Sequence, residues 1–520
     1  MIMNIQNTIT NKQEVWIGVD LGTTGVRAIA YDVEGQKYCS SEAFYPLLTP
    51  HPDWAEENPL QIFESVEKVI KETAAELRYK NCLLQGIALS TVMHSFAGLD
   101  EHYEPLMDMQ TWADSRSASI VKEMKQDEKL CRSFYEKTGC PIHACYPLAK
   151  VIWLRRNHPE IFQQMRYVGS LKDYIFRGLT GEWLIDHSAA STSGRYNEKN
   201  MDWDDEILAY AGLRREQMPK IVSTTYMSKL SSQAAAAMEL PEGVPVVIGA
   251  TDGVLVNVGI GAVHPGQLSA TIGTSGALRM LTSQPMTDPK MRTWCYNLVD
   301  DMWVAGGAIN NGGMILRWVR DKICHYTKAH LENLDVDGYD LMTMKASHIP
   351  AGSEGLIMLP CFTGERAPYW NSELRGMFFG LSLNHRRSHM IRATMEGICY
   401  SMNAVLDALK EFGEIQDIRV SGSFTKSDLW LQILSDVLNE KLTLPNNSEG
   451  AAFGAVVLGF IASGRLKSIK DTIELVHPRK VYTPIPENAV TYKELYGIFE
   501  RLYWNLQQEF VDIAAFQKKM

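Results

Sequence analysis

The sequence predicts an α/β protein of two domains, and three observations support that fold class. The chain has 520 residues, more than one hydrophobic core usually serves. Strand-like and helix-like segments alternate in both halves, as they do in α/β layers. A Gly-Thr hairpin occurs once in each half, which indicates an internal duplication. We place the boundary between the two copies, so the expected domains are 1–262 and 263–520.

The sequence predicts two similar β-hairpins, one in each half of the chain. In each, an apolar strand leads into a turn of glycine and threonine and then into a second strand that carries an arginine. The copies are residues 15–20, 21–25 and 26–32 with Arg27, and residues 268–272, 273–276 and 277–279 with Arg279. Glycine turns can direct backbone N–H groups at an anion, and threonine hydroxyls add donors. A single copy would be read as an ordinary turn, whereas the repetition favours phosphate binding.

The second half of the chain carries a helix, a strand and further helices. Apolar residues recur at four- and three-residue steps from Ile391 to Leu409, which predicts a long helix that Ser388 can cap. A short strand at 417–420 and a helix at about 427–438 follow. Residues 450–464 predict a small-residue helix that is too short to span a bilayer.

Composition and charge exclude several functional classes. The chain is 45% hydrophobic and 22% charged, with a formal net charge of -10, so nucleic acid is not an expected partner. The polar start lacks the apolar core of a secretory signal. The apolar stretch 244–263 contains Pro245 and Asp252, which favours buried elements over a membrane span. Nine cysteines without a Cys-x-x-Cys pair predict a reduced cytoplasmic protein without structural metal.

Asp252 is the strongest single candidate for catalysis. It stands between an apolar strand and a segment that starts with Gly253. Capping of a helix and acceptance of a hydroxyl proton during phosphoryl transfer are both compatible with this position. Asp20, just before the first turn, can hold the Mg²⁺ that accompanies ATP, directly or through water.

A site for a polyhydroxylated ligand is indicated by Trp112, Asp114 and Arg116, which supply an aromatic plate, an acceptor and a fork of donors. A solvated Asp–Arg pair beside a partly buried Trp is the structural alternative. His94 follows an apolar strand and therefore stands where ligand groups usually lie, although a lone His is more often structural. Residues 360–370 are interpreted as an interdomain connection without a chemical role.

Together these segments resemble the FGGY carbohydrate kinases, a family of the actin/hexokinase/Hsp70-type ATPase fold group. The similarity runs from about Val15 to about Gly464 and is most specific at Gly-Met-Phe-Phe-Gly-Leu (376–381), with His389-Met390 and Ala-Thr-Met-Glu (393–396) following. Gly-Glu-Arg-x-Pro-x-Trp (364–370) and Trp-Ala-Glu (54–56) also match. The first family signature, near 147–153, is only partly kept because Cys145 stands where another residue type is usual. The resemblance implies two actin-like, ribonuclease H-like ATPase domains with ATP and sugar in the cleft between them.

The resemblance also assigns roles to individual positions. It implies Asp252 as the catalytic base, Asp20 at the magnesium ion, and ATP and Mg²⁺ as cofactors. The nucleotide-binding positions so implied are Thr23, Thr24, Arg27, Thr271, Gly273, Thr274, Gly307, Asn311, Gly422 and Lys426. The substrate-binding positions are Met93, His94, Trp112, Asp114, Arg116, His143 and Asp252. Ser421-Gly422-Ser423 replaces a more glycine-rich triplet, which leaves the adenosine contacts undefined.

Within this family the sugar-site segments are most similar to the gluconate kinases, which implies phosphorylation of D-gluconate to 6-phosphogluconate. A sugar acid needs positive partners in an acidic protein, and we expect His94, His143, Arg116 and Lys150 to supply them. A pentulose kinase for xylulose or ribulose is the alternative within the family. An actin- or Hsp70-like binding protein controlled by nucleotide is the alternative of another class. The expected partners are a sugar or sugar acid and ATP, with no membrane and a possible homodimer.

Overall fold

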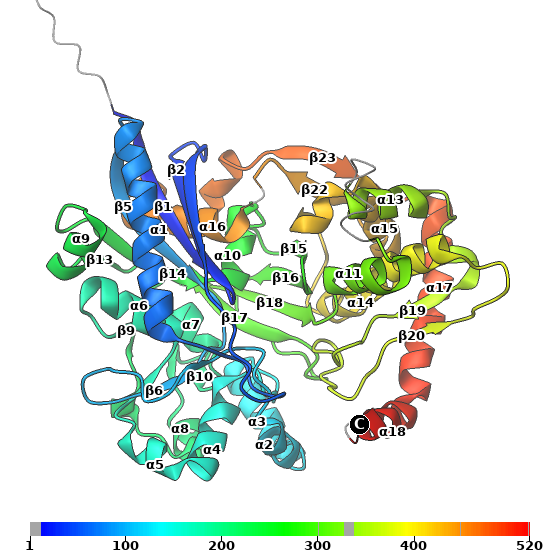
Figure 1. Ribbon diagram of the computed structural model, residues 1–520, viewed down its shortest axis with the longest axis horizontal. Helices are drawn as coiled ribbons and strands as arrows, with labels where there is room; N and C mark the ends of the chain where they lie inside the picture. The colour runs from blue at the N-terminus through cyan, green and yellow to red at the C-terminus, as the bar shows by residue number, and fades with distance from the viewer. Residues whose placement is uncertain (1–11, 300, 327–336, 448, 518, 520) are drawn as a thin grey trace, which may run out of the picture.

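Two mixed β-sheets organise the chain, and each belongs largely to one half of it (Figure 1). The computed structural model describes residues 12–299, 301–326, 337–447, 449–517 and 519. The first sheet has the order β13 (Met227–Lys229), β14 (Pro245–Thr251), β5 (Leu83–Thr91), β1 (Glu14–Leu21), β2 (Gly25–Asp32) and β3 (Lys37–Phe44). The second has the order β17 (Trp294–Val299), β18 (Met302–Ile309), β16 (Gly276–Thr282), β15 (Gln267–Ile272), β21 (Asp417–Ser421), β22 (Leu442–Pro445) and β23 (Pro478–Tyr482).

The two predicted hairpins occupy equivalent places in the two sheets. Strands β1 and β2 pair antiparallel, with Asp20 opposite Arg27, and β15 and β16 pair antiparallel, with Thr271 opposite Ala277. The first strand of each hairpin also has a parallel neighbour, β5 for β1 and β21 for β15. Because parallel strands end at the same edge, both glycine turns lie at the carboxyl edge of their sheet, where ligand groups gather.

Helices cover both sheets. The helices of the first half are α1 (Pro59–Tyr79), α2 (Ala118–Met124), α3 (Glu128–Thr138), α4 (Pro147–Asn157), α5 (Pro159–Gln164), α6 (Leu171–Thr180), α7 (His187–Ser191), α8 (Asp205–Ala211), α9 (Ser232–Met238) and α10 (Asp252–Gly259). Those of the second half are α11 (Gly313–Trp318), α13 (Gly338–Ser347), α14 (Arg387–Lys410), α15 (Asp428–Leu438), α16 (Gly450–Ala462), α17 (Pro486–Asn505) and α18 (Gln507–Gln517). Among the described helices, none combines the length and apolar character needed to cross a membrane.

One helix departs from the division into halves. Helix α16 comes from the C-terminal half, yet it packs against β1, β5 and α10, and Figure 1 shows it in orange among the blue strands. The approach is so close that a Cβ on Gly18 would lie 2.3 Å from the carbonyl oxygen of Ala452. Residues 450–462 therefore cover part of the first sheet, although they lie in the second half of the chain. The domain boundary near residue 262 stays a prediction from the sequence.

The remaining strands are short and form two-stranded sheets, four of them in the first half of the chain. They pair as β4 (Glu56–Glu57) with β7 (Met109–Gln110), β6 (Ala97–Leu99) with β8 (Tyr167–Gly169), β9 (Leu184–Asp186) with β12 (Lys220–Val222), and β10 (Tyr196–Asn197) with β11 (Asp202–Trp203). In the second half β19 (Ile357–Leu359) pairs with β20 (Met377–Phe379). All nine cysteines are buried and free.

The helices of the second half follow the predicted ranges, with one difference at a cap. Helix α15 begins after Ser427, whose hydroxyl accepts from the backbone N–H of Trp430. Helix α14 begins two residues earlier than predicted: Arg386 is the N-cap residue, and its backbone N–H donates to Nδ1 of His389. Ser388 therefore lies inside the first turn, because a histidine at the third helical position supplies the capping acceptor.

The packing of α16 against α10 predicts opposite effects for two Gly→Ala substitutions in helices. A Cβ on Gly454 in α16 would lie 2.3 Å from the carbonyl oxygen of Leu255, whereas one on Gly497 in α17 meets only the end of Arg501 at 3.6 Å. Gly454→Ala should destabilise the protein by about 1–3 kcal/mol through overpacking. Gly497→Ala should stabilise it by about 0.5–1 kcal/mol through backbone entropy. Urea unfolding followed by circular dichroism measures both, and equal shifts would contradict the close crossing.

Candidate active site

A cleft of about 290 Å³ lies between the two halves and is lined by residues of both. From the first half come Thr23, Met93, His94, Trp112, Cys145, Tyr146, Asp252 and Gly253. From the second half come Thr271, Gly273, Ser275, Arg279, Trp294, Tyr296, Arg366 and Trp370. Both glycine turns and Asp252 thus meet in one pocket, as the sequence predicts for a ligand held between two domains.

The position of Asp252 follows from the way β14 ends. Gly249 has φ +69°, and a Cβ there would lie 1.7 Å from the carbonyl oxygen of Leu89, so only glycine permits β14 to run this close to β5. Strand β14 ends at Thr251 and Asp252 is the first residue of α10, with Oδ1 accepting from the N–H of Gly253 at 2.7 Å. The side chain is half-buried in the cleft. Burial, together with the nearby charge of Asp20, raises the pKa of Asp252 to about 7.

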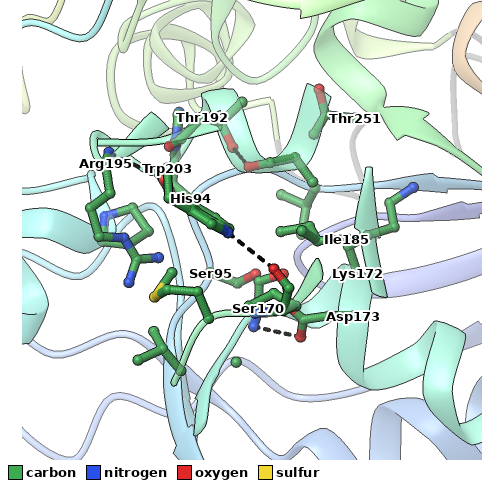
Figure 2. Close-up of a pocket in the computed structure, with 18 residues that line it drawn as sticks. His94, Ser95, Ser170, Lys172, Asp173, Ile185, Thr192, Arg195, Trp203 and Thr251 are labelled. Atoms are coloured by element: carbon green, nitrogen blue, oxygen red, sulfur yellow. Dashed lines mark hydrogen bonds between the residues drawn. The ribbon is translucent and has the colours of Figure 1, made fainter. Parts of the chain in front are cut away.

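Lys172 holds the end of β14, directly before Asp252, and was not among the residues predicted for the site. Its Nζ donates to the carbonyl oxygens of Ile248 at 2.7 Å and Ala250 at 3.1 Å, and lies 3.6 Å from Oδ2 of Asp186. Burial lowers the pKa of Lys172, and the Asp186 carboxylate opposes that effect. Figure 2 shows Lys172 among the residues that line a small cavity, to which His94 also contributes. A lysine on an otherwise apolar helix face was the available signal in the sequence.

His94 faces the cleft as a neutral ring. Its backbone has φ +66°, an unusual conformation for a residue with a side chain, of the kind that clusters at functional sites. Nδ1 lies 2.8 Å from the carbonyl oxygen of Thr192, so Nδ1 carries the proton and Nε2 is an acceptor. Burial lowers the pKa of His94 to about 3. His94 is thus suited to accept a hydrogen bond from a sugar hydroxyl and does not supply positive charge.

Aromatic side chains form the walls of the cleft. Trp294 and Tyr296 on β17 stack with ring centroids 4.4 Å apart and planes at 8°. The hydroxyls of Tyr146 and Tyr296 lie 2.7 Å apart, which joins the two halves across the pocket. Trp112, which lines the cleft, donates from Nε1 to Oγ1 of Thr23 at 2.8 Å and so contacts the first glycine turn. Such faces suit the C–H surface of a sugar.

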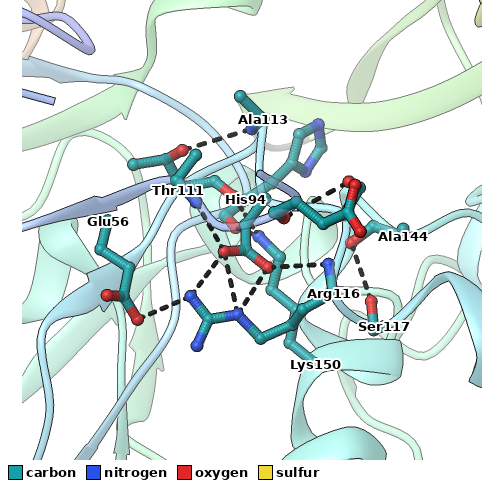
Figure 3. A network of polar contacts seen from close by, with 12 residues as sticks. Glu56, His94, Thr111, Ala113, Arg116, Ser117, Ala144 and Lys150 are labelled. Atoms are coloured by element: carbon teal, nitrogen blue, oxygen red, sulfur yellow. Dashed lines mark hydrogen bonds and ion pairs between the residues drawn. The ribbon is translucent and has the colours of Figure 1, made fainter. Parts of the chain in front are cut away.

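Asp114 and Arg116 form a buried ion pair and are not among the residues that line the cleft. Figure 3 shows Arg116 between Glu56 and Lys150 in a network of polar contacts. Arg116 donates from Nη2 to Oδ2 of Asp114 at 2.7 Å and to Oε1 of Glu56 at 2.6 Å. Lys150 donates to the carbonyl oxygens of His94 at 2.7 Å and Thr111 at 2.6 Å. Both cations therefore hold the chain segments that carry His94 and Trp112, and their charge faces protein oxygens.

His143 also has an internal role in the structure. Its Nδ1 accepts from the N–H of Cys145 at 3.2 Å, and its ring stands edge-on to Trp370 at 5.3 Å. Burial lowers its pKa to about 3, with Lys125 contributing. The expectation that His94, His143, Arg116 and Lys150 give positive charge to a sugar acid is thus corrected: two are neutral and two are committed to protein groups.

Charged side chains lie on the strands on either side of the first glycine turn. Asp20 accepts from the hydroxyl of Ser90 at 2.7 Å, and burial raises its pKa. Arg27, exposed on the neighbouring strand, pairs with Glu449 at 3.0 Å and with Glu42 at 3.3 Å. Glu449 directly precedes α16 and carries no motif in the sequence that would have indicated it. Thr24 is exposed at the tip of the turn.

The second turn is open toward the cleft. A Cβ added to Gly273 would meet no atom of the described residues within 4 Å. The carbonyl oxygen of Thr274 accepts from the N–H groups of Gly312 and Met314, each at 3.2 Å, which ties the turn to the start of α11. Thr271 lies 3.0 Å from Ser421 through their hydroxyls, so the turn is also joined to β21. This arrangement leaves room for an anion at the turn.

The other implied nucleotide positions differ in their surroundings. Gly307 is packed, since a Cβ there would lie 2.6 Å from Val405. Asn311 is buried and donates to the carbonyl oxygen of Gly364 at 2.7 Å, so it anchors the loop 363–366. Gly422 has φ +99° at the end of β21, and Lys426 is exposed beside it. Gly422 and Lys426 follow β21 at the carboxyl edge of the second sheet. Gly307 and Asn311 are held by contacts within the protein.

Residues 360–370 are more than a connection, which corrects the sequence interpretation. Arg366 and Trp370 line the cleft. Arg366 lies over Trp112, with its guanidinium carbon 5.0 Å from the ring centroid, and its Nε donates to Oδ1 of Asn310 at 2.7 Å. Arg279 lines the cleft as well, although its sequence position indicated only that it belongs to the repeated hairpin.

Two related hairpins and a carboxylate line one cleft between the two halves, an arrangement suited to phosphoryl transfer in a two-domain protein. Models of the FGGY family of carbohydrate kinases match residues 15–259 (N-terminal domain) and 268–463 (C-terminal domain). Gluconokinase of Bacillus subtilis is 37% identical over 505 residues, covering 96% of this chain and 98% of that protein. The chain belongs to the FGGY family of carbohydrate kinases: it is an ATP-dependent kinase with an alcohol group as acceptor.

Two solved structures are similar over nearly the whole chain. Gluconate kinase from Lactobacillus acidophilus has a TM-score of 0.89 and 30% sequence identity, covering 95% of this chain and 98% of its own. Ligand-bound xylulose kinase from the same organism has a TM-score of 0.90 and 30% identity, covering 96% of this chain and 100% of its own. The predicted two-domain α/β kinase fold is thereby confirmed.

The raised pKa of Asp252 predicts that this side chain costs stability at alkaline pH. The folded-state pKa of about 7 lies above the unfolded value, so folding favours the protonated form. The penalty grows as pH rises from about 4 to about 7 and is fully present above that range. Asp252→Asn should therefore melt at a higher temperature than the wild type at pH 8, with the difference shrinking toward pH 4. Calorimetry at the two pH values measures this, and a lower melting temperature at pH 8 contradicts it.

Proposed function

We propose that this kinase transfers the γ-phosphoryl group of ATP to the terminal hydroxyl of D-gluconate, which yields 6-phosphogluconate and ADP. The observation that carries the proposal is Asp252, whose carboxylate lines the same cleft as both glycine turns. A terminal hydroxyl beside that carboxylate would face a γ-phosphoryl group held at the turns. The relatedness to gluconokinase of Bacillus subtilis supports gluconate as the acceptor.

In this mechanism Asp252 orients the hydroxyl and accepts its proton. The hydroxyl oxygen forms a bond to the γ-phosphorus while the bond from that phosphorus to the β,γ-bridging oxygen breaks, and ADP leaves. Because the transition state is largely dissociative, positioning and charge stabilisation contribute most of the rate. His94 accepts from a hydroxyl of the sugar through Nε2, and the stacked Trp294 and Tyr296 border its C–H face. Closure of the two halves excludes water, an alternative acceptor.

Asp20 fits the requirements of a magnesium site. Mg²⁺ is commonly held by one or two carboxylates together with phosphate oxygens and water. Asp20 offers a carboxylate beside the first turn, oriented by Ser90. We propose that Asp20 holds Mg²⁺, which neutralises charge on the phosphates when bound.

A pentulose kinase is the second candidate, and the likeness to ligand-bound xylulose kinase supports it. The gluconate proposal is favoured by sequence, since a gluconokinase matches at 37% identity. The cleft also carries more positive charge than a neutral pentulose requires, from Arg279 and Arg366. With nine buried free thiols, we propose a reducing, cytoplasmic location. A homodimer remains a proposal from the sequence.

A substrate panel tests both the acceptor and the base. ADP release is measured with MgATP and gluconate, xylulose, ribulose or glycerol, for the wild type and Asp252→Asn. We expect the highest kcat/KM with gluconate, and a loss of about 100- to 10,000-fold in the variant, the usual contribution of a positioned base. Highest activity with a pentulose would keep the mechanism and replace the acceptor. Undiminished turnover by the variant would exclude Asp252 as the base.

The pH dependence provides an independent test of the base. Only ionised Asp252 can accept the proton, and its pKa in the free protein is about 7. The kcat/KM for gluconate should therefore fall tenfold per pH unit below about pH 7 and level off above it. The profile is measured from pH 5 to 9 by stopping the reaction at each pH and then quantifying the ADP with a coupled assay at a fixed pH. A flat profile down to pH 5 is incompatible with this assignment.

A further inference from the structure

Two arginines in the cleft have no task in the proposed phosphoryl transfer. Arg279 lies on β16 and Arg366 on the loop that follows β19, and both line the pocket that contains Asp252 and His94. They are the cationic side chains among the residues that line this pocket in the described part of the chain. Positive charge next to a polyol site is costly to keep unless an anion uses it.

The strand pattern of β16 directs Arg279 into the cleft. Leu278 and Met280 are buried in the core of the second half, so the alternate positions, including Arg279, face the other side. Gly306 is the cross-strand neighbour of Arg279 and has no side chain to cover it. Arg279 donates from Nη1 to Oγ1 of Thr271 at 3.3 Å.

The Nε–H of Arg279 is buried and has no hydrogen-bond partner among the described residues. A buried donor that lacks an acceptor is costly, and in native proteins such a group usually meets a ligand, an ion or water. The atom lies 3.6 Å from the point that a Cβ on Gly253 would occupy, and Met93 Cε is 2.1 Å from the same point. The unused donor is thus next to Gly253, the residue after Asp252, and near Met93, both of which line the cleft.

Arg366 approaches the same space with a fixed orientation. Its Nε is bound to Asn310 and its guanidinium rests over Trp112, so rotation is restricted. Burial lowers the pKa of Arg279 to about 10, and the neighbouring charges of Asp252 and Arg366 act on it in opposite directions. Two guanidinium groups that converge on one pocket repel each other, and an anion between them removes that repulsion.

We propose that Arg279, with Arg366, binds the carboxylate of gluconate and selects a sugar acid over a neutral sugar. This inference rests on the proposed function. The other cations considered for this role, Arg116 and Lys150, are committed to protein oxygens. A phosphate role for Arg279 is disfavoured because its unused donor faces Met93 and Gly253, whereas the glycine turns provide the anion sites for ATP.

The test compares D-gluconate with D-gluconamide, which has the same chain and a neutral amide in place of the carboxylate. The discrimination is the ratio of kcat/KM for the two substrates, measured at saturating MgATP. Charge-assisted hydrogen bonds predict that Arg279→Leu reduces this ratio about 10- to 100-fold, mainly through a higher KM for gluconate. Arg279→Lys retains the charge without the planar fork and should keep part of the discrimination.

Arg27→Leu is the matched control, since Arg27 occupies the corresponding place in the first hairpin but is exposed and paired with Glu42 and Glu449. It should raise the KM for ATP and leave the gluconate-to-gluconamide ratio unchanged. Thermal unfolding verifies that each variant is folded. If Arg279→Leu does not fold, Arg279→Lys and Arg366→Lys supply the comparison, and full retention of the ratio in both overturns the inference.

The remaining outcomes separate this inference from the function on which it rests. An unchanged ratio in folded Arg279→Leu overturns the carboxylate assignment while leaving gluconate as the substrate. Equal losses on both substrates, together with a higher KM for ATP, also overturn it and assign Arg279 to the phosphates. A wild type that does not phosphorylate gluconate contradicts the proposed function before any variant is compared.

Discussion

The crossing of α10 and α16 is the contact on which the site depends. Two glycines permit it: a Cβ on Gly259 would lie 1.8 Å from the carbonyl oxygen of Gly450, and one on Gly454 would lie 2.3 Å from that of Leu255. Backbones at this separation leave little freedom for α10 to shift, because protein interiors are close-packed. Asp252 is the first residue of α10, so its place between the two sheets is set by helix packing as well as by β14.

Two buried lysines stabilise the backbone segments around the cleft. Cations that support the backbone are buried and surrounded by oxygens, as Lys172 is by the carbonyls at the end of β14 and Lys150 is by those of two loops. Such lysines compensate polar groups that would otherwise be unsatisfied. The Asp252 carboxylate accepts from the N–H of Gly253 and is half-buried at the cleft, where a carboxylate can take up a proton from a bound hydroxyl.

The sequence was sufficient for the fold because local patterns and the duplicated hairpin agree. The strands at 15–20 and 268–272, the long helix α14 and the family signature at 376–381 each indicate the same architecture. Asp252, His94 and Trp112 all line the cleft, and the first two follow the parallel strands β14 and β5 of the first sheet. Their assigned roles in binding and catalysis remain proposals.

Other parts of the site depend on contacts between distant segments and carry no local signal. The sequence does not reveal that Arg116 is paired with Glu56, a residue far away in the chain, and therefore it was expected to face substrate. Burial likewise decides the charge of His94 and His143, and burial of a single histidine is not visible in a short motif. Arg279 was visible in the repeated hairpin, but its orientation follows only from the register of β16.

The placement of α16 has a consequence for biosynthesis. Trp16 and Ala88 of the first sheet belong to one apolar cluster with Phe453 and Val456 of α16. During translation the strands therefore leave the ribosome long before the helix that covers them, and their apolar face stays exposed to water in the interval. We therefore expect the N-terminal half to complete its packing only once residues 450–462 have emerged, with aggregation or chaperone binding favoured until then.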